Sequence, residues 1–113
     1  MARSERVHRP LRKSEYAIRF ASTKAEKGWI NLVAVRRNDM VDTWEYLTQT
    51  PLSESPRNSP LRGALGTVQH EGTAHARWQH KPSLRDGARI WFYVDGSDVF
   101  IEQVFTAHPN QTK

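Results

Sequence analysis

The sequence predicts an α+β fold in which an N-terminal strand and a two-helix hairpin pack on an antiparallel sheet of about four strands. Three features support this prediction. A short alternating segment comes first, two segments with apolar residues three and four apart follow, and the last third of the chain alternates again. With 113 residues, 37% of them hydrophobic, the chain has room for one domain with a modest core.

The first strand is expected where Tyr16, Ile18 and Phe20 alternate with small or charged residues. The residues before it, 1–14, are mostly charged or small and carry a net charge of +4. Because they offer little apolar surface to offset the entropy of ordering, we expect a flexible basic arm at 1–14 and a single domain at 15–113.

Two helices are expected next. Ser22 and Thr23 can cap a helix over about 23–37, whose apolar face has the three-and-four spacing. The residues that recur at this spacing are Ala25, Trp29, Leu32, Val33 and Arg36. An interior Gly28 weakens the prediction, since glycine costs about 1 kcal/mol relative to alanine there. Asn38 and Asp39 can end this helix and cap the second, which Thr50 and Pro51 stop.

A loop and several strands complete the predicted fold. The run at 51–60 holds three prolines and three serines, which is typical of a loop. Strands are expected at 77–82, 88–95 and 98–106, with a weaker one at 66–70 before a flexible-looking Gly72. The last two strands should form a hairpin across Gly96-Ser97, because Asp95-Gly96 is a strong turn signal.

The charge of the chain indicates an anionic partner. The net charge is +5 and the isoelectric point is near 10, and within the domain residues 57–89 concentrate a net charge of +4. The sequence has no cysteine, no signal-peptide pattern and no apolar run of membrane-spanning length, so a cytoplasmic location is expected.

Most enzyme classes lose their usual sequence support. Nucleotide-binding glycine loops, HExxH and GxSxG are all absent. The regular spacing of His70, His75 and His80 could suggest a metal site, but these residues lack cysteine partners and helical spacing. We therefore expect neither a metal nor a cofactor.

Two neighbouring strands place cations beside aromatic rings. Alternation puts Arg77, Gln79 and Lys81 on one face, opposite Trp78 and His80. In the next strand, Arg89, Trp91 and Tyr93 share the face opposite an apolar one. Such a surface suits RNA, because arginine pairs with phosphate and aromatic rings stack on unpaired bases. An ordinary solvated sheet face, with Trp91 covered by a helix, is the alternative.

Four segments in this half of the chain carry a family resemblance. They are PLRG at 60–63, RWQHKP at 77–82, ARIWFYVDG at 88–96 and VFTAHPNQTK at 104–113. Together they resemble RelE/ParE-superfamily toxins of actinobacterial and phage toxin–antitoxin systems. The resemblance implies a RelE-like mRNA endonuclease that works on the ribosome without a metal, inhibits translation and is silenced by a cognate antitoxin.

The resemblance also implies roles for individual residues. Metal-free RNA cleavage needs a base for the 2′-hydroxyl proton, cations for the phosphate and an acid for the leaving oxygen. Arg89 matches the family's strand arginine, and His108 is the expected acid or base, with Tyr93 or Lys81 as substitutes. The full expectation is a catalytic set of Arg89, His108, Arg77 and Tyr93, and an RNA-binding set of Arg62, Lys81, Trp91, Arg57 and Lys113.

Two departures from the family keep other functions open. The basic run that several RelE toxins carry after the second helix is here the neutral loop at 51–60. The arm at 1–14 is also not a core part of the family, and we expect at most a weak, salt-sensitive RNA contact from it. A ParE-like inhibitor of DNA gyrase and a non-catalytic RNA-binding module are the alternatives, since a fold alone does not determine function.

Overall fold

The computed structural model describes residues 9–85 and 87–106, and these residues form an α+β fold. The helices are α1 (Thr23–Val35) and α2 (Arg37–Gln49), and a short 3-10 turn, η1, spans Gly63–Gly66. The strands are β1 (Ala17–Phe20), β2 (Asn58–Pro60), β3 (Thr67–His70), β4 (Thr73–Ala76), β5 (Trp78–His80), β6 (Arg89–Asp95) and β7 (Asp98–Phe105). Neither described helix is long and apolar enough to cross a membrane.

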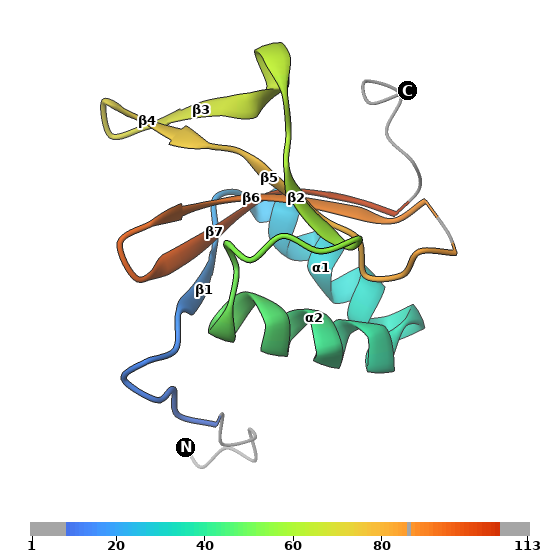
Figure 1. Cartoon of the computed structure of the whole chain (residues 1–113). Helices are drawn as coiled ribbons and strands as arrows, with labels where there is room; N and C mark the ends of the chain where they lie inside the picture. The colour runs from blue at the N-terminus through green and yellow to red at the C-terminus, as the bar shows by residue number, and fades with distance from the viewer. Residues whose placement is uncertain (1–8, 86, 107–113) are drawn as a thin grey trace.

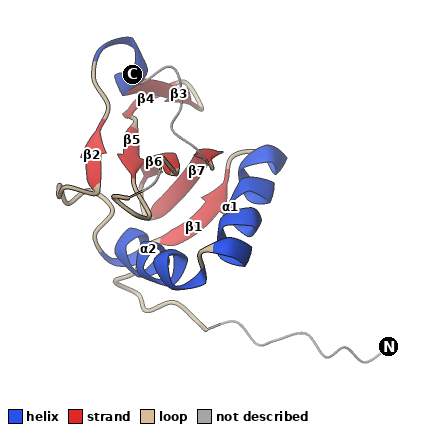
Figure 2. Ribbon diagram, turned by 90° about the vertical axis from the view of Figure 1, so that its right-hand side faces the viewer, coloured by secondary structure: helices blue, strands red, loops and turns tan. Residues whose placement is uncertain are grey.

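The main sheet has five strands in the order β1-β7-β6-β5-β2. Both helices pack on one face of it, and the separate β3–β4 hairpin lies on the other face (Figure 1). Figure 2 shows β1 beside β7, with α1 next to both. The two faces therefore differ: one is covered by helices, and the other carries a small two-stranded sheet.

The expectation of a wholly antiparallel sheet of about four strands was wrong in two respects. Strand β1 runs parallel to β7, with Ala17 opposite Asp98 and Phe20 opposite Ile101. The predicted loop at 51–60 also contributes β2, which pairs with β5. Alternation along a strand indicates which face is buried, but it carries no information about the direction of a partner distant in the chain.

The helices follow the predicted pattern, except at their junction. The Ser22 hydroxyl accepts a hydrogen bond from the Ala25 N–H at 3.0 Å, as a helix cap does. The prediction that Asn38 and Asp39 separate the helices was wrong. The break lies at Arg36, whose φ of −140° leaves the helical region while its N–H still donates to the Leu32 carbonyl at 2.7 Å. Asp39 instead lies in the first turn of α2, where a carboxylate favours the positive end of the helix dipole.

The core lies between the helices and the inner face of the sheet. Leu32 of α1 and Leu47 of α2 meet Ile90, Phe92 and Ile101 there, and all five are at most 1% exposed. Burying a side chain of this kind contributes about 1.5–3 kcal/mol relative to leaving it in water. The period-two and three-and-four patterns of the sequence correspond to these buried faces.

The β6–β7 hairpin forms as predicted and contains a bulge. Its loop is Gly96-Ser97, with Gly96 at a φ of +62°, and Asp95 pairs with Asp98. Further along, Trp91 pairs with Gln103 but Phe92 pairs with Ile101, which leaves Glu102 as an extra residue in β7. Glu102 lies two residues after Phe100, which stacks on Tyr93, so it is on the face of the sheet opposite the helices.

The β3–β4 hairpin was predicted only in part. The weak strand at 66–70 is confirmed as β3, whereas the flexible-looking segment at Gly72 forms the turn and the start of β4. The two turn residues are Glu71, with a φ of +51°, and Gly72, with a φ of +80°. A two-residue turn with both φ values positive normally uses Asn-Gly or Asp-Gly, so a glutamate at its first position hides the hairpin from sequence reasoning.

Replacing this glutamate tests the strain in the turn. We expect Glu71→Asn to stabilise the hairpin by about 1 kcal/mol, because asparagine adopts positive φ more readily than glutamate. Hydrogen exchange of the β3 and β4 amides in metal-free buffer should slow accordingly. Glu71→Gln removes the same charge but keeps an unfavourable residue in the turn, so equal slowing in both variants would contradict the backbone explanation.

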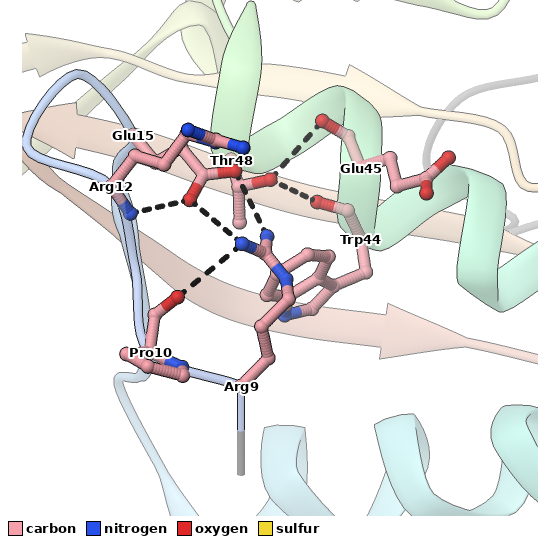
Figure 3. A network of polar contacts seen from close by, with 7 residues as sticks. All are labelled: Arg9, Pro10, Arg12, Glu15, Trp44, Glu45 and Thr48. Carbon is pink, nitrogen blue, oxygen red and sulfur yellow. Dashed lines mark hydrogen bonds and ion pairs between the residues drawn. The ribbon is translucent and has the colours of Figure 1, made fainter.

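The residues just before β1 contact helix α2. The Arg9 guanidinium donates two hydrogen bonds to the Glu15 carboxylate, at 3.2 and 2.9 Å, and lies 4.7 Å from the ring centroid of Trp44 (Figure 3). The hydrogen bond from Arg9, together with one from the Arg12 N–H, lowers the pKa of Glu15. The described end of the predicted arm is therefore bound to α2, while residues 1–8 lie outside the described part of the chain.

Candidate functional site

The predicted faces of β5 and β6 are those seen in the structure. On the helix side, Trp78 packs on Phe92 and the His80 ring lies 5.2 Å from that of Tyr46. On the other side, the Trp91 indole N–H donates to the Gln79 side-chain oxygen at 2.9 Å. Arg89, Trp91 and Tyr93 therefore share the face that also carries the β3–β4 hairpin.

Trp91 does not present the exposed ring that alternation predicted. It is only 2% exposed, with the Phe105 ring edge-on at 4.9 Å and the Arg77 guanidinium 5.5 Å from its ring centroid. Arg77 is held in turn by two hydrogen bonds to the Glu102 carboxylate, at 2.7 and 2.8 Å. The expectation of an exposed Trp91 was wrong because Phe105 packs on the indole and Glu102, on the same face, fixes Arg77 across it.

The predicted cations differ in their availability. Arg89 is 9% exposed, and its Nη1 donates to the Ala88 carbonyl at 2.9 Å. Arg62 and Arg57 are exposed, and Lys81 is partly exposed. The Lys81 N–H donates to the Arg57 carbonyl at 2.7 Å, so both residues lie where β2 begins and β5 ends. His108 and Lys113 lie outside the described residues.

A cluster that sequence reasoning missed surrounds Tyr93. The Tyr93 hydroxyl lies 3.0 Å from Nδ1 of His70, and its ring stacks on His75 and on Phe100. In the β3–β4 register, Val68 pairs with His75, so His70 and His75 occupy diagonal positions on one face of the hairpin. The only signal in the sequence was the even spacing of the histidines.

His80, the third histidine of that spacing, lies apart from the cluster. It faces the helices, is 3% exposed and contacts the Asn58 side-chain oxygen through Nδ1 at 3.1 Å. Burial, together with the charge of Arg57, lowers the pKa of His80 to about 4. Of the three evenly spaced histidines, the fold therefore brings together only His70 and His75.

The Tyr93–His70 pair can transfer or orient a proton. Burial raises the pKa of Tyr93, and the charges of Glu102, Asp95 and Glu71 add to this effect, so the phenol stays protonated near neutral pH. In one tautomer the phenol donates to Nδ1 and His70 offers an N–H at Nε2. In the other, Nδ1–H donates to the phenol oxygen and Nε2 offers a lone pair.

Comparisons with protein-family models, with curated proteins and with solved structures found no match for this chain.

Proposed function

We propose that this protein is a RelE-like toxin that cleaves RNA by acid–base chemistry, without a metal in the reaction. The observation that carries the proposal is the hydrogen bond between Tyr93 and His70. It places a titratable imidazole on the same sheet face as Arg89 and Arg77, beside a phenol that can set its tautomer. The resemblance of residues 60–63, 77–82, 88–96 and 104–113 to RelE/ParE-superfamily toxins adds independent support.

The reaction needs one proton removed and one supplied. A base takes the proton of a ribose 2′-hydroxyl, and the oxygen attacks the adjacent phosphorus to form a cyclic phosphate. The bond to the 5′-oxygen breaks, and an acid protonates that leaving oxygen. We assign these two roles to His70 and His108, with Tyr93 orienting His70 and Arg89 among the cations that hold the phosphate.

The exposed cations define how RNA would approach. Arg57 and Lys81 lie at the ends of β2 and β5, and Arg62 follows β2. Their charge would hold the RNA backbone, since phosphate contacts position a strand without reading its sequence. The substrate in this proposal is mRNA, on the ribosome, in the cytoplasm, and a cognate antitoxin would silence the activity.

Induction of the full chain in bacteria tests this proposal. We expect growth arrest with new mRNA ends. His70→Gln and His108→Gln should each reduce the cleavage rate about 10²- to 10⁴-fold, the usual contribution of a general acid or base. Arg37→Gln, an exposed substitution on α2, is the matched control and should cleave like the wild type.

The other outcomes contradict the proposal in distinct ways. Cleavage that persists in His70→Gln but not in His108→Gln would remove His70 from the site. Arrest without cleavage, in the wild type and both variants, would favour a gyrase-inhibiting ParE-like toxin. The ion pair of Arg77 with Glu102 favours this second candidate, because it neutralises one of the cations predicted to be catalytic. RNA binding without arrest or cleavage would indicate a non-catalytic module.

A further inference from the structure

We propose that the β3–β4 hairpin carries a binding site for a divalent transition metal ion, zinc in the first instance, formed by His70, His75, Asp95 and Glu71. His70, His75 and Glu71 belong to the hairpin, and Asp95 is the last residue of β6. The inference does not rest on the proposed function, because it concerns binding alone.

The imidazole nitrogens and carboxylate oxygens of these four side chains are too far apart for hydrogen bonds with one another. Nε2 of His70 lies 3.8 Å from Oδ2 of Asp95 and 3.9 Å from Oε2 of Glu71. Nε2 of His75 lies 3.8 Å from the same Asp95 oxygen. Direct hydrogen bonds between such groups span about 2.7–3.2 Å, so these side chains converge without bonding to one another.

The same distances suit an ion placed between the side chains. In a tetrahedral zinc site with bonds of about 2.1 Å, neighbouring ligand atoms are about 3.4 Å apart. The three separations given above exceed this by about 0.4–0.5 Å, a difference that small side-chain rotations can remove. The candidate ligand atoms of His70, Glu71 and Asp95 all lie within 4.8 Å of one another.

His75 supplies an independent indication. Its Nε2 is buried, with under 1 Å² of accessible surface, and has no hydrogen-bond partner among the described residues. An unsatisfied buried nitrogen costs about 1–3 kcal/mol, so such atoms normally have a partner. A metal ion beside Asp95 would provide that partner.

The surrounding contacts match those of metal-binding histidines. Such a histidine generally donates its second ring N–H to a neighbouring oxygen, which fixes the tautomer that leaves the other nitrogen free for the metal. His70 has this arrangement, with Nδ1 3.0 Å from the Tyr93 hydroxyl and Nε2 toward the carboxylates. Two neutral imidazoles and two carboxylates would also balance the double charge of the ion.

The ligand types indicate which metals fit. Imidazole nitrogen favours zinc, nickel, cobalt or copper, whereas calcium and magnesium prefer sites built from oxygen alone. We therefore expect Zn²⁺ and Co²⁺ to bind and Mg²⁺ not to compete.

The site would join a weakly held element to the main sheet. No residue of β3 or β4 is buried, and the rings of His70 and His75 pack on those of Tyr93 and Phe100 in the main sheet. A metal bound by both the hairpin and the end of β6 would fix their relative position, as metal clips do in small domains. It would also occupy the Nε2 lone pair of His70, so metal binding and the acid–base role of His70 exclude each other.

Titration of the untagged full chain, stripped with a chelator, tests the site. We expect one Zn²⁺ bound per chain by calorimetry, the visible absorption bands of tetrahedral Co²⁺, and a rise in melting temperature on adding zinc. His75→Gln and Glu71→Gln should each weaken zinc binding more than about tenfold, since loss of even an outer-shell partner costs about 10- to 100-fold. The Glu71 side chain is 82% exposed, so its substitution keeps the test valid should His75→Gln fail to fold.

A matched control separates this site from other histidines. The double variant His8→Gln/His108→Gln removes two histidines that are not among the proposed ligands and should bind zinc like the wild type. No zinc binding by the wild type would overturn the proposal, as would unchanged affinity in both cluster variants or loss of binding in the double variant. None of these readouts involves RNA, so failure here leaves the proposed nuclease untouched, and failure of the nuclease leaves the metal site untouched.

Discussion

Lowering the pH from about 6.5 to about 4 should reduce the free energy of unfolding by about 3 kcal/mol through His80 alone. In the folded protein the pKa of His80 is about 4, against an ordinary value of 6.5. Across this window the unfolded chain takes up a proton on His80 and the folded chain does not. The contribution of His80 to the free energy of unfolding is therefore fully present above pH 6.5 and is lost as the pH falls towards 4.

The surroundings of His80 explain why the folded state rejects the proton. The ring is 3% exposed, and Nδ1 lies 3.1 Å from the Asn58 side-chain oxygen. The Asn58 amide nitrogen donates to the carbonyls of Pro51 and Ser53 at 2.8 and 3.0 Å, so its oxygen is the atom left to accept from His80. Charging the ring would place a second cation in a buried site that already feels the positive charge of Arg57.

Urea unfolding measured between pH 7.5 and 4 checks this prediction. The wild type should lose stability as the pH falls below about 6.5, and His80→Asn should lose about 3 kcal/mol less over the same range. The difference between the two proteins isolates His80 from the other histidines. Glu15, whose pKa is lowered, contributes stability that is lost only below its ordinary range near pH 4.5. Parallel pH profiles for the two proteins would refute the role of His80.

Replacing Gly28 with alanine should destabilise the protein by about 1–3 kcal/mol, the usual cost of forcing an extra methyl group into a packed interior. Helix propensity alone predicts the opposite sign, a gain of about 1 kcal/mol. A Cβ at position 28 would lie 2.7 Å from the Cβ of Val104 and 3.3 Å from its carbonyl oxygen. Because β7 is held at Val104 by its pairing with β6, α1 would have to move away from it.

Denaturant unfolding of Gly28→Ala shows whether the substitution lowers or raises the free energy of unfolding. Ile30→Ala, at a position that is 57% exposed on the same helix, is the matched control and should change stability by no more than about 0.5 kcal/mol. A Gly28→Ala variant more stable than the wild type would show that helix propensity outweighs the contact with Val104.

The candidate site was predictable only where it depended on local alternation. Tyr93, Trp91 and Arg89 were correctly placed on one face of β6, because side chains alternate along any strand. Their burial was not predictable, since it depends on Phe105 and Arg77 around Trp91 and on the β3–β4 hairpin. His70 and His75 were missed because only the register of that hairpin, across an atypical Glu71-Gly72 turn, brings them together with Asp95.

The sequence by itself determined the α+β class, both helices, the helix cap at Ser22 and the β6–β7 hairpin. These depend on periodicity and on turn chemistry, which act over a few neighbouring residues. The tertiary structure alone decided that β1 lies parallel to β7, that Asn58–Pro60 joins the sheet and that Glu102 neutralises Arg77. Each of these links residues that are distant in the chain, and such contacts depend on how whole elements pack and leave no local pattern in the sequence.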